Sequence, residues 1–125
     1  MLHPFEYAVV RVVPRVERDE FVNVGVIVFC AERDYLAARI ELDEARLLAL
    51  HPATDVELLR EHLEAIPRVC DGDPESGPIA RLPLRERFSW LVSPRNTILQ
   101  TSPPHAGLCD TPELWLERLL TRMVR

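Results

Sequence analysis

The first quarter of the chain consists of two long apolar runs separated by a short charged stretch. Residues 5–13 and 21–30 are rich in valine, phenylalanine and isoleucine, which favour β-strands, and residues 15–20 are mostly charged. Both runs are apolar at consecutive positions, so each strand is expected to be covered on both faces. Pro14 cannot donate to a strand ladder and should end the first run. The pattern predicts a hairpin at the centre of a sheet.

The second of these strands carries a glycine at an interior position. Gly25 within a strand usually marks a β-bulge or the close approach of another backbone. Strict alternation of side chains gives two expected faces. One holds Phe21, Asn23, Gly25, Ile27 and Phe29, and the other holds Val22, Val24, Val26, Val28 and Cys30.

The rest of the pattern predicts one more strand of the meander, then helices, a fourth strand and a last helix. Thr54 and Glu57 have the spacing of a capping box, and Pro67 is expected to end the helix that follows. The expected elements are strands at 35–42 and 97–101, helices at 44–50, 56–66, 83–92 and from 112 onward, and loops at 68–81 and 102–107.

This order of elements is typical of the α+β class, as a two-layer sandwich. We expect a mainly antiparallel sheet of about four strands, beginning with a β-meander, with helices packed on it. The length of 125 residues fits one domain spanning residues 1–125. The second face of the sheet is also apolar, so either the helices cover it or a second copy or another protein does.

Composition excludes several chemistries. All 15 basic residues are arginine, so the chain has no lysine for a Schiff base, a P-loop or a kinase ATP site. The net charge of −5 makes a nucleic-acid partner a poor expectation. The longest apolar run, residues 22–30, is too short to span a membrane, and no signal peptide is recognisable, which favours the cytoplasm and no membrane partner.

Metal, cofactor and disulfide chemistry are not indicated. The three cysteines, Cys30, Cys70 and Cys109, are far apart, and we expect a buried Cys30 and surface thiols at the other two. The histidines are scattered without metal-ligand spacing. Both tryptophans are expected in the core. We therefore expect no cofactor and no metal.

Two groups of polar residues remain as candidate ligand-binding sites. Arg11 interrupts an apolar strand, so it needs either an internal carboxylate, for which Glu20 is the candidate, or an anionic ligand. Asn23 either fixes the bulge or joins such a pocket. The second group surrounds the predicted fourth strand. It comprises Ser93, Arg95, Asn96, Thr97, Gln100, Ser102 and His105.

Turn and capping roles are the default for the small residues of the second group. Arg95 follows a proline and is expected to point its guanidinium outward, whereas His105 near Ser102 lacks a third residue for nucleophilic catalysis. No catalytic residue is therefore assigned. The combined candidate site is Arg11, Glu20, Asn23, Arg95, Gln100 and His105.

Two segments resemble an uncharacterised bacterial family, domain of unknown function 3037. The first is Tyr-Ala-Val-Val-Arg-Val-Val-Pro at 7–14, followed by Arg-Asp-Glu-Phe-Val-Asn-Val-Gly-Val at 18–26. The second begins at Arg87 and ends at Gly107. The resemblance implies no established activity. It does imply a functional link with a HipA-like serine/threonine kinase, because many members are encoded beside one.

Two hypotheses follow. The first is a non-enzymatic interaction or accessory module, with a HipA-like kinase or a second copy of the chain as its partner. The second is a small-anion- or nucleotide-binding domain, or a small enzyme, with a polar pocket between the 11–25 hairpin and the 93–105 segment. The second hypothesis requires that these two segments meet in space.

Overall fold

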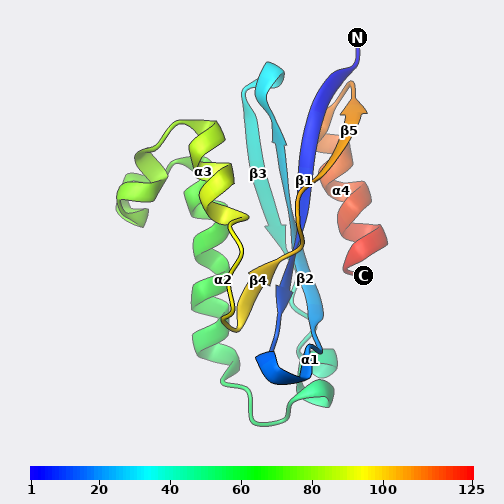
Figure 1. Cartoon of the computed structure of the whole chain (residues 1–125), viewed down its shortest axis with the longest axis vertical. Helices are drawn as coiled ribbons and strands as arrows, with labels where there is room; N and C mark the ends of the chain where they lie inside the picture. The colour runs from blue at the N-terminus through cyan, green and yellow to red at the C-terminus, as the bar shows by residue number, and fades with distance from the viewer.

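The computed structural model describes all 125 residues and contains one antiparallel sheet with four α-helices (Figure 1). The α+β class is confirmed, with five strands instead of about four. The strands are β1 (His3–Val12), β2 (Val22–Cys30), β3 (Tyr35–Ile40), β4 (Leu99–Thr101) and β5 (His105–Cys109). The helices are α1 (Glu44–Leu50), α2 (Val56–Asp71), α3 (Leu84–Leu91) and α4 (Pro112–Met123).

The long strand β1 is the centre of the sheet. It pairs with β2 along one edge, and β3 completes the predicted meander beyond β2. Along its other edge β1 pairs with β4 near one end and with β5 near the other. The predicted central position of the hairpin is therefore confirmed.

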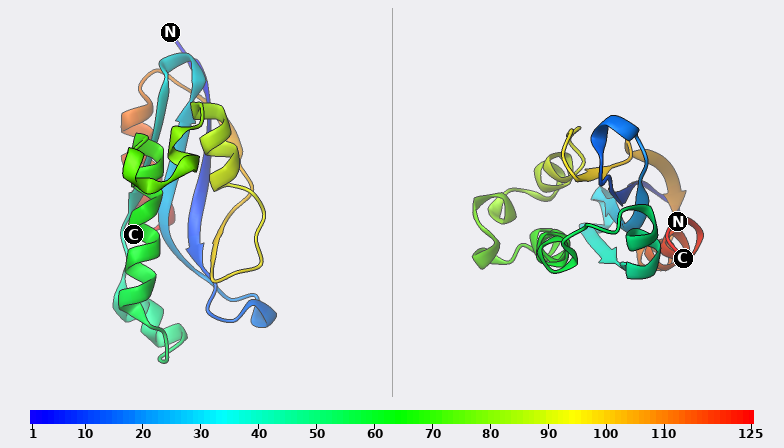
Figure 2. Two further views of the ribbon diagram at one scale, coloured as in Figure 1. Left: turned by 90° about the vertical axis from the view of Figure 1, so that its left-hand side faces the viewer. Right: turned by 90° about the horizontal axis from the view of Figure 1, so that it is seen from below.

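Helices lie against both faces of the sheet, where a two-layer sandwich was expected (Figures 1 and 2). On one face, α4 packs over β2, and Leu119 and Leu120 join Phe5, Val26 and Val28 in one buried cluster. On the other face, α2 and α3 build a larger cluster. Its members include Val10, Val12, Ile27, Phe29, Leu59, Leu63 and Phe88. No helix is both long and apolar enough to cross a membrane.

A β-bulge interrupts the hairpin at the predicted glycine. Val10 lies opposite Gly25 whereas Arg11 lies opposite Asn23, so Val24 is an extra residue in β2. A methyl group at Gly25 would lie 2.6 Å from the carbonyl oxygen of Arg39 in β3. Gly25 therefore permits both the bulge and the close approach of the neighbouring strand.

On passing the bulge, the odd- and even-numbered side chains of β2 exchange faces of the sheet. Val22 and Val24 pack in the same cluster as Ile27 and Phe29, on the α2 face. Val26, Val28 and Cys30 belong to the α4 face. Strict alternation along the whole strand was therefore wrong, because one extra residue shifts the two-residue period by one position.

Ser102 joins the two short strands that share one edge of β1. Its backbone N–H donates to the carbonyl of Val9 (2.8 Å), and its hydroxyl accepts the Val9 N–H (2.9 Å). Pro103 and Pro104 follow and have no N–H to offer. The expected loop at 102–107 was wrong in its second half, because β5 resumes pairing with β1 at His105.

Removing the Ser102 hydroxyl should therefore destabilise the protein. Ser102 is the one buried polar side chain, 3% exposed, and Ser102→Ala leaves the Val9 N–H without its acceptor. We expect the free energy of unfolding to fall by about 1–3 kcal/mol in urea denaturation. Ser93→Ala, which removes an exposed hydroxyl bonded to the Ser89 carbonyl, is the control and should have less than half this effect.

The helix after residue 54 differs from expectation at both ends. Asp55 caps it by accepting from the Leu58 N–H, and the Thr54 hydroxyl donates to the His51 carbonyl instead of forming a capping box. The helix also continues through Pro67 to Asp71, where Gly72 caps it with a left-handed φ of 73°. The extension buries Val69 and Cys70, which offsets the hydrogen bond that a proline removes.

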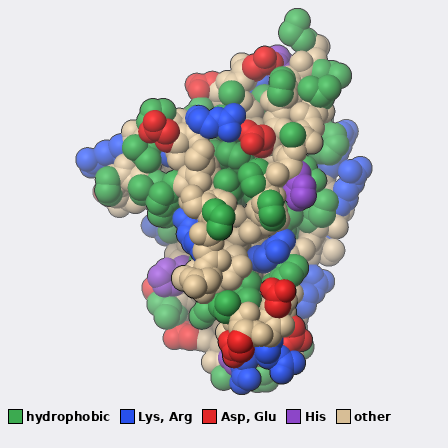
Figure 3. All heavy atoms as spheres, viewed as in Figure 1, with side chains coloured by type: hydrophobic (Ala, Val, Ile, Leu, Met, Phe, Trp, Pro, Cys, Tyr) green, Lys and Arg blue, Asp and Glu red, His purple; other side chains and the backbone are tan.

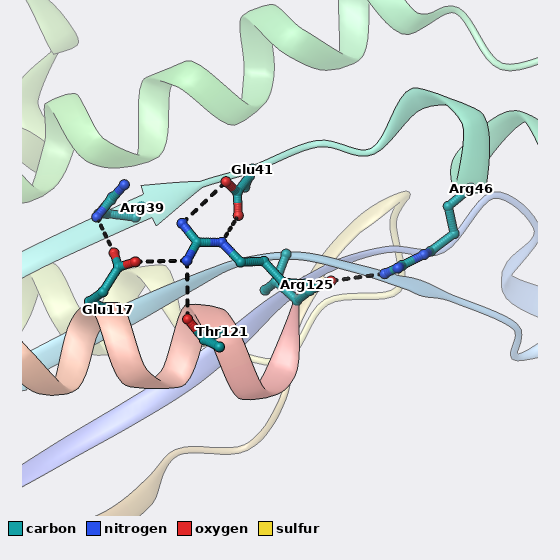
Figure 4. A network of polar contacts seen from close by, with 7 residues as sticks. Arg39, Glu41, Arg46, Glu117, Thr121 and Arg125 are labelled. Carbon is teal, nitrogen blue, oxygen red and sulfur yellow. Dashed lines mark hydrogen bonds and ion pairs between the residues drawn. The ribbon is translucent and has the colours of Figure 1, made fainter.

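The end of α4 is fastened to the β3 side of the sheet by polar contacts (Figure 4). Arg125 donates to Glu41 (2.7 Å) and to Glu117 (2.7 Å), and Glu117 also pairs with Arg39. These bonds with Arg125 lower the pKa of the Glu117 carboxyl. On the other side, Arg46 of α1 donates to the Val124 carbonyl (2.8 Å). The contacts orient α4 over the sheet.

Candidate functional site

The two segments that resemble a family meet in the sheet. Arg11 of β1 lies directly between Asn23 of β2 and Gln100 of β4. Residues directly opposite one another on neighbouring strands point to the same face. Three of the six candidate residues therefore form one row across the sheet.

Arg11 has no ionic partner within the chain. The expected Arg11–Glu20 pair is wrong, because Glu20 pairs with Arg18 (2.5 Å) in the hairpin turn. The Arg11 guanidinium instead lies over the Phe21 ring, 4.1 Å from its centroid. Arg11 Nε and Asn23 Oδ1 are both buried without a hydrogen-bond partner. The row therefore carries the positive charge of Arg11 and two buried polar atoms without a hydrogen-bond partner.

Asn23 has a structural role as well. Its Nδ2 donates to the carbonyl of Met123 (3.0 Å), one of the last carbonyls of α4. Such carbonyls have no partner inside the helix, so a side-chain donor satisfies a group that would otherwise be unpaired. The bulge places Asn23 on the α4 face and so makes this contact.

His105 lies away from that row, whereas Arg95 lies beside its Gln100 end and lines two hollows together with Gln100. The Arg95 guanidinium donates to the carbonyls of Leu91 (2.9 Å) and Trp90 (2.8 Å) and stacks over the Trp90 ring, so it folds back onto the end of α3. The His105 ring stacks against Tyr7, with centroids 5.2 Å apart. Tyr7 is four residues from Arg11, or about 13 Å along the strand. The six candidate residues do not form one pocket.

Two adjoining hollows lie between α2 and β4. They have volumes of about 470 and 350 Å³ and share His62, Thr97 and Leu99. Figure 2 (left) shows α2 on one side and the segment leading into β4 on the other, with β1 between them. We call this feature the α2–β4 groove. Its apolar lining includes Val10, Val12, Leu59, Ile66, Val69 and Leu99.

Large apolar side chains stand exposed along the α2–β4 groove. Leu58, Trp90 and Ile98 line it and are 51%, 43% and 50% exposed. Trp90 was expected in the core and lies at the surface instead. In Figure 3, hydrophobic side chains reach the surface between the helices on the left and the strands in the middle. The sequence signal was Leu58, an apolar residue next to Leu59, which belongs to the buried side of the helix.

The three thiols are all buried, so the expected surface thiols at Cys70 and Cys109 were wrong. Burial raises the pKa of the Cys70 thiol to about 12, and it also raises that of Cys109. The described residues contain no cluster of three or more histidine, cysteine or acidic side chains placed to hold a metal ion.

Native protein should therefore react slowly with thiol reagents. At pH 8 we expect the Cys70 thiol to be modified about a hundredfold more slowly than in the urea-unfolded chain, because burial suppresses the thiolate and hinders access. Because the folded-state pKa of Cys70 is raised from 9.0, its contribution to stability is present below pH 9 and is lost as the pH rises toward 12. Equal rates in native and unfolded protein would contradict the burial of Cys70.

The fold and the groove together define an α+β domain with a helix–strand groove on one face. The chain belongs to the DUF3037 family of proteins of unknown function, whose family model matches residues 7–124. No curated protein and no solved structure matches the chain significantly.

Proposed function

We propose that this domain is a non-enzymatic interaction module that binds a protein partner through the α2–β4 groove in the cytoplasm. The observation that carries the proposal is the pair of joined apolar hollows with Leu58, Trp90 and Ile98 exposed along them. Exposed apolar surface around a concave site is typical of protein-binding surfaces. Burying these side chains against a partner would supply the driving force for association.

The proposed partner is a HipA-like serine/threonine kinase, and the resemblance of the two sequence segments to their family supports this choice. A second copy of the chain is the competing occupant of the groove. The test is to mix the purified domain with a purified HipA-like kinase, and to measure the size of the resulting species by gel filtration and the heat of binding by calorimetry. A complex at micromolar concentration supports the proposal. Independent migration of the two proteins rules out this kinase, and self-association of the domain alone points to the homodimer.

A second candidate function rests on Arg11. Its half-buried guanidinium has no carboxylate partner, and its Nε is a buried donor without an acceptor. A small anion, such as a phosphate of a nucleotide, would supply the missing charge. Titration of inorganic phosphate and of ATP, followed by amide shifts, tests this. Shifts centred on Arg11 that vanish in Arg11→Gln support an anion site, and the absence of shifts at millimolar phosphate excludes it.

A further inference from the structure

We propose that the occupant of the α2–β4 groove is an extended peptide segment of the partner protein, which adds to the sheet as a new strand beside β4. This inference rests on the proposed function, because it specifies how the partner is bound. Three features of the molecule carry it: the free edge of β4, the two hollows beside it, and the charges at the two ends of the groove.

The first feature is the direction of the backbone groups of β4. The Val13 N–H donates to the Ile98 carbonyl, and the Ser102 N–H donates to the Val9 carbonyl, so residues 98, 100 and 102 face β1. In an antiparallel pair, the backbone N–H and C=O groups of every second residue point toward the partner strand, and those of the residues between them point away from it. The backbone groups of Thr97, Leu99 and Thr101 therefore point away from β1, along an edge with no neighbouring strand.

Side chains cover only some of these outward groups. The Thr97 hydroxyl donates to the Leu99 carbonyl (3.0 Å), and Gln100 Nε2 donates to the Thr97 carbonyl (2.9 Å). The outward N–H groups of Leu99 and Thr101 have no acceptor in the chain. A short edge strand whose carbonyls are already hydrogen-bonded resists uncontrolled strand pairing. Its free backbone N–H groups can still donate to the carbonyls of an added strand.

The second feature is the position of the hollows. Leu99 and Thr101 both line the groove, and they pair with Val12 and Val10, which form its floor. A strand added beside β4 would place every second side chain on the same face as Leu99 and Thr101, at the rim of the groove, and the others on the opposite face. A bound helix satisfies its own backbone and would leave the free amides of β4 unpaired. The edge therefore favours an extended occupant over a helical one.

The third feature is charge. Asp55 lines the hollow at the start of α2 and Arg95 lines the other hollow, and these are the formally charged side chains in the two linings at neutral pH. Opposite charges at the two ends favour one direction of the bound peptide. The occupant is thus an extended segment with apolar residues at alternate positions, a basic residue near Asp55 and an acidic residue near Arg95.

A displayed library of random twelve-residue peptides tests the pattern directly. We expect enriched peptides with apolar residues at i, i+2 and i+4, and we expect N-methylation of alternate backbone nitrogens in the best peptide to weaken binding about tenfold. Enrichment of an i, i+3, i+4, i+7 pattern would mean a helical occupant and would overturn the inference. Failure to enrich any peptide would overturn it too.

Variants of Thr101 test the edge itself. Thr101→Pro removes one outward N–H without removing a bond to β1, and proline is tolerated on edge strands in this orientation. We expect it to bind the best peptide and the kinase about tenfold more weakly than the control Thr101→Val, which keeps the N–H. Circular dichroism and urea denaturation of both variants confirm that each is folded.

The outcomes separate the inference from the proposed function. If the kinase binds, Leu58→Glu weakens it and Thr101→Pro does not, the strand-addition inference fails while the interaction module stands. If the kinase does not bind but extended peptides do, the inference stands and the partner is another protein. If the free domain dimerises and Thr101→Pro makes it monomeric, the occupant is a second copy and the inference fails.

Discussion

Gly25→Ala should lower the free energy of unfolding by about 3 kcal/mol, the upper end of the usual cost of overpacking. The added methyl would lie 2.6 Å from both the Arg39 carbonyl oxygen and Ile40 Cδ1, and 3.3 Å from Ile40 Cα. The clash with Arg39 involves backbone, so relief requires β3 to move away from β2. That movement would loosen the pairing of Gly25 with Ile40 and the bulge that orients Asn23.

Gly107→Ala is the matched control, because it adds the same methyl group to another strand of the sheet. There the nearest atom is Cε1 of the Phe5 ring, 2.8 Å away, and a side chain can shift more easily than a backbone. Urea denaturation of both variants should show the larger loss for Gly25→Ala. An equal loss, or no loss at Gly25, would mean that the close approach of β3 does not determine which residue is tolerated there.

Leu58→Glu should weaken binding of the HipA-like kinase about thirtyfold if the proposed interface is correct. Leu58 is half exposed on the wall of the α2–β4 groove, so binding would bury the new carboxylate against apolar surface. The substitution should leave folding intact, because glutamate is favourable in the first turn of a helix.

Leu114→Glu is the control for this measurement. Leu114 is also the third residue of its helix and is 54% exposed, against 51% for Leu58. It belongs to α4, on the opposite face of the sheet from α2. Calorimetric titration should show nearly unchanged affinity for Leu114→Glu. Equal weakening by both variants would place the binding surface elsewhere or indicate a general effect of charge.

The local pattern of the sequence predicted the hairpin, the meander and most helix positions. Apolar runs and turn residues specify these elements because neighbouring residues determine them. The exchange of faces along β2 was not predictable, although Gly25 indicated a bulge, because the extra residue is defined by the register against β1. Strand β5 was missed because its ladder is formed with residues 3–7 of β1, which are distant in sequence.

The candidate site was predictable only in part. Arg11, Asn23 and Gln100 do form a row, because two polar segments flank the same central strand. The α2–β4 groove was not foreseen, because its walls come from a helix and a strand that are distant in the sequence. The exposure of Leu58 on α2 and of Trp90 on α3 depends on how these helices pack against the sheet. A local sequence pattern does not contain that packing.

The most direct test of the central claim is a methyl NMR titration of the isotope-labelled domain with the HipA-like kinase. Binding through the α2–β4 groove predicts that the methyl signals of Leu58, Ile98 and Leu99 shift or broaden first, while those of Leu114 on α4 stay unchanged. Shifts confined to α4, with the groove methyls unaffected, would contradict the proposed interface.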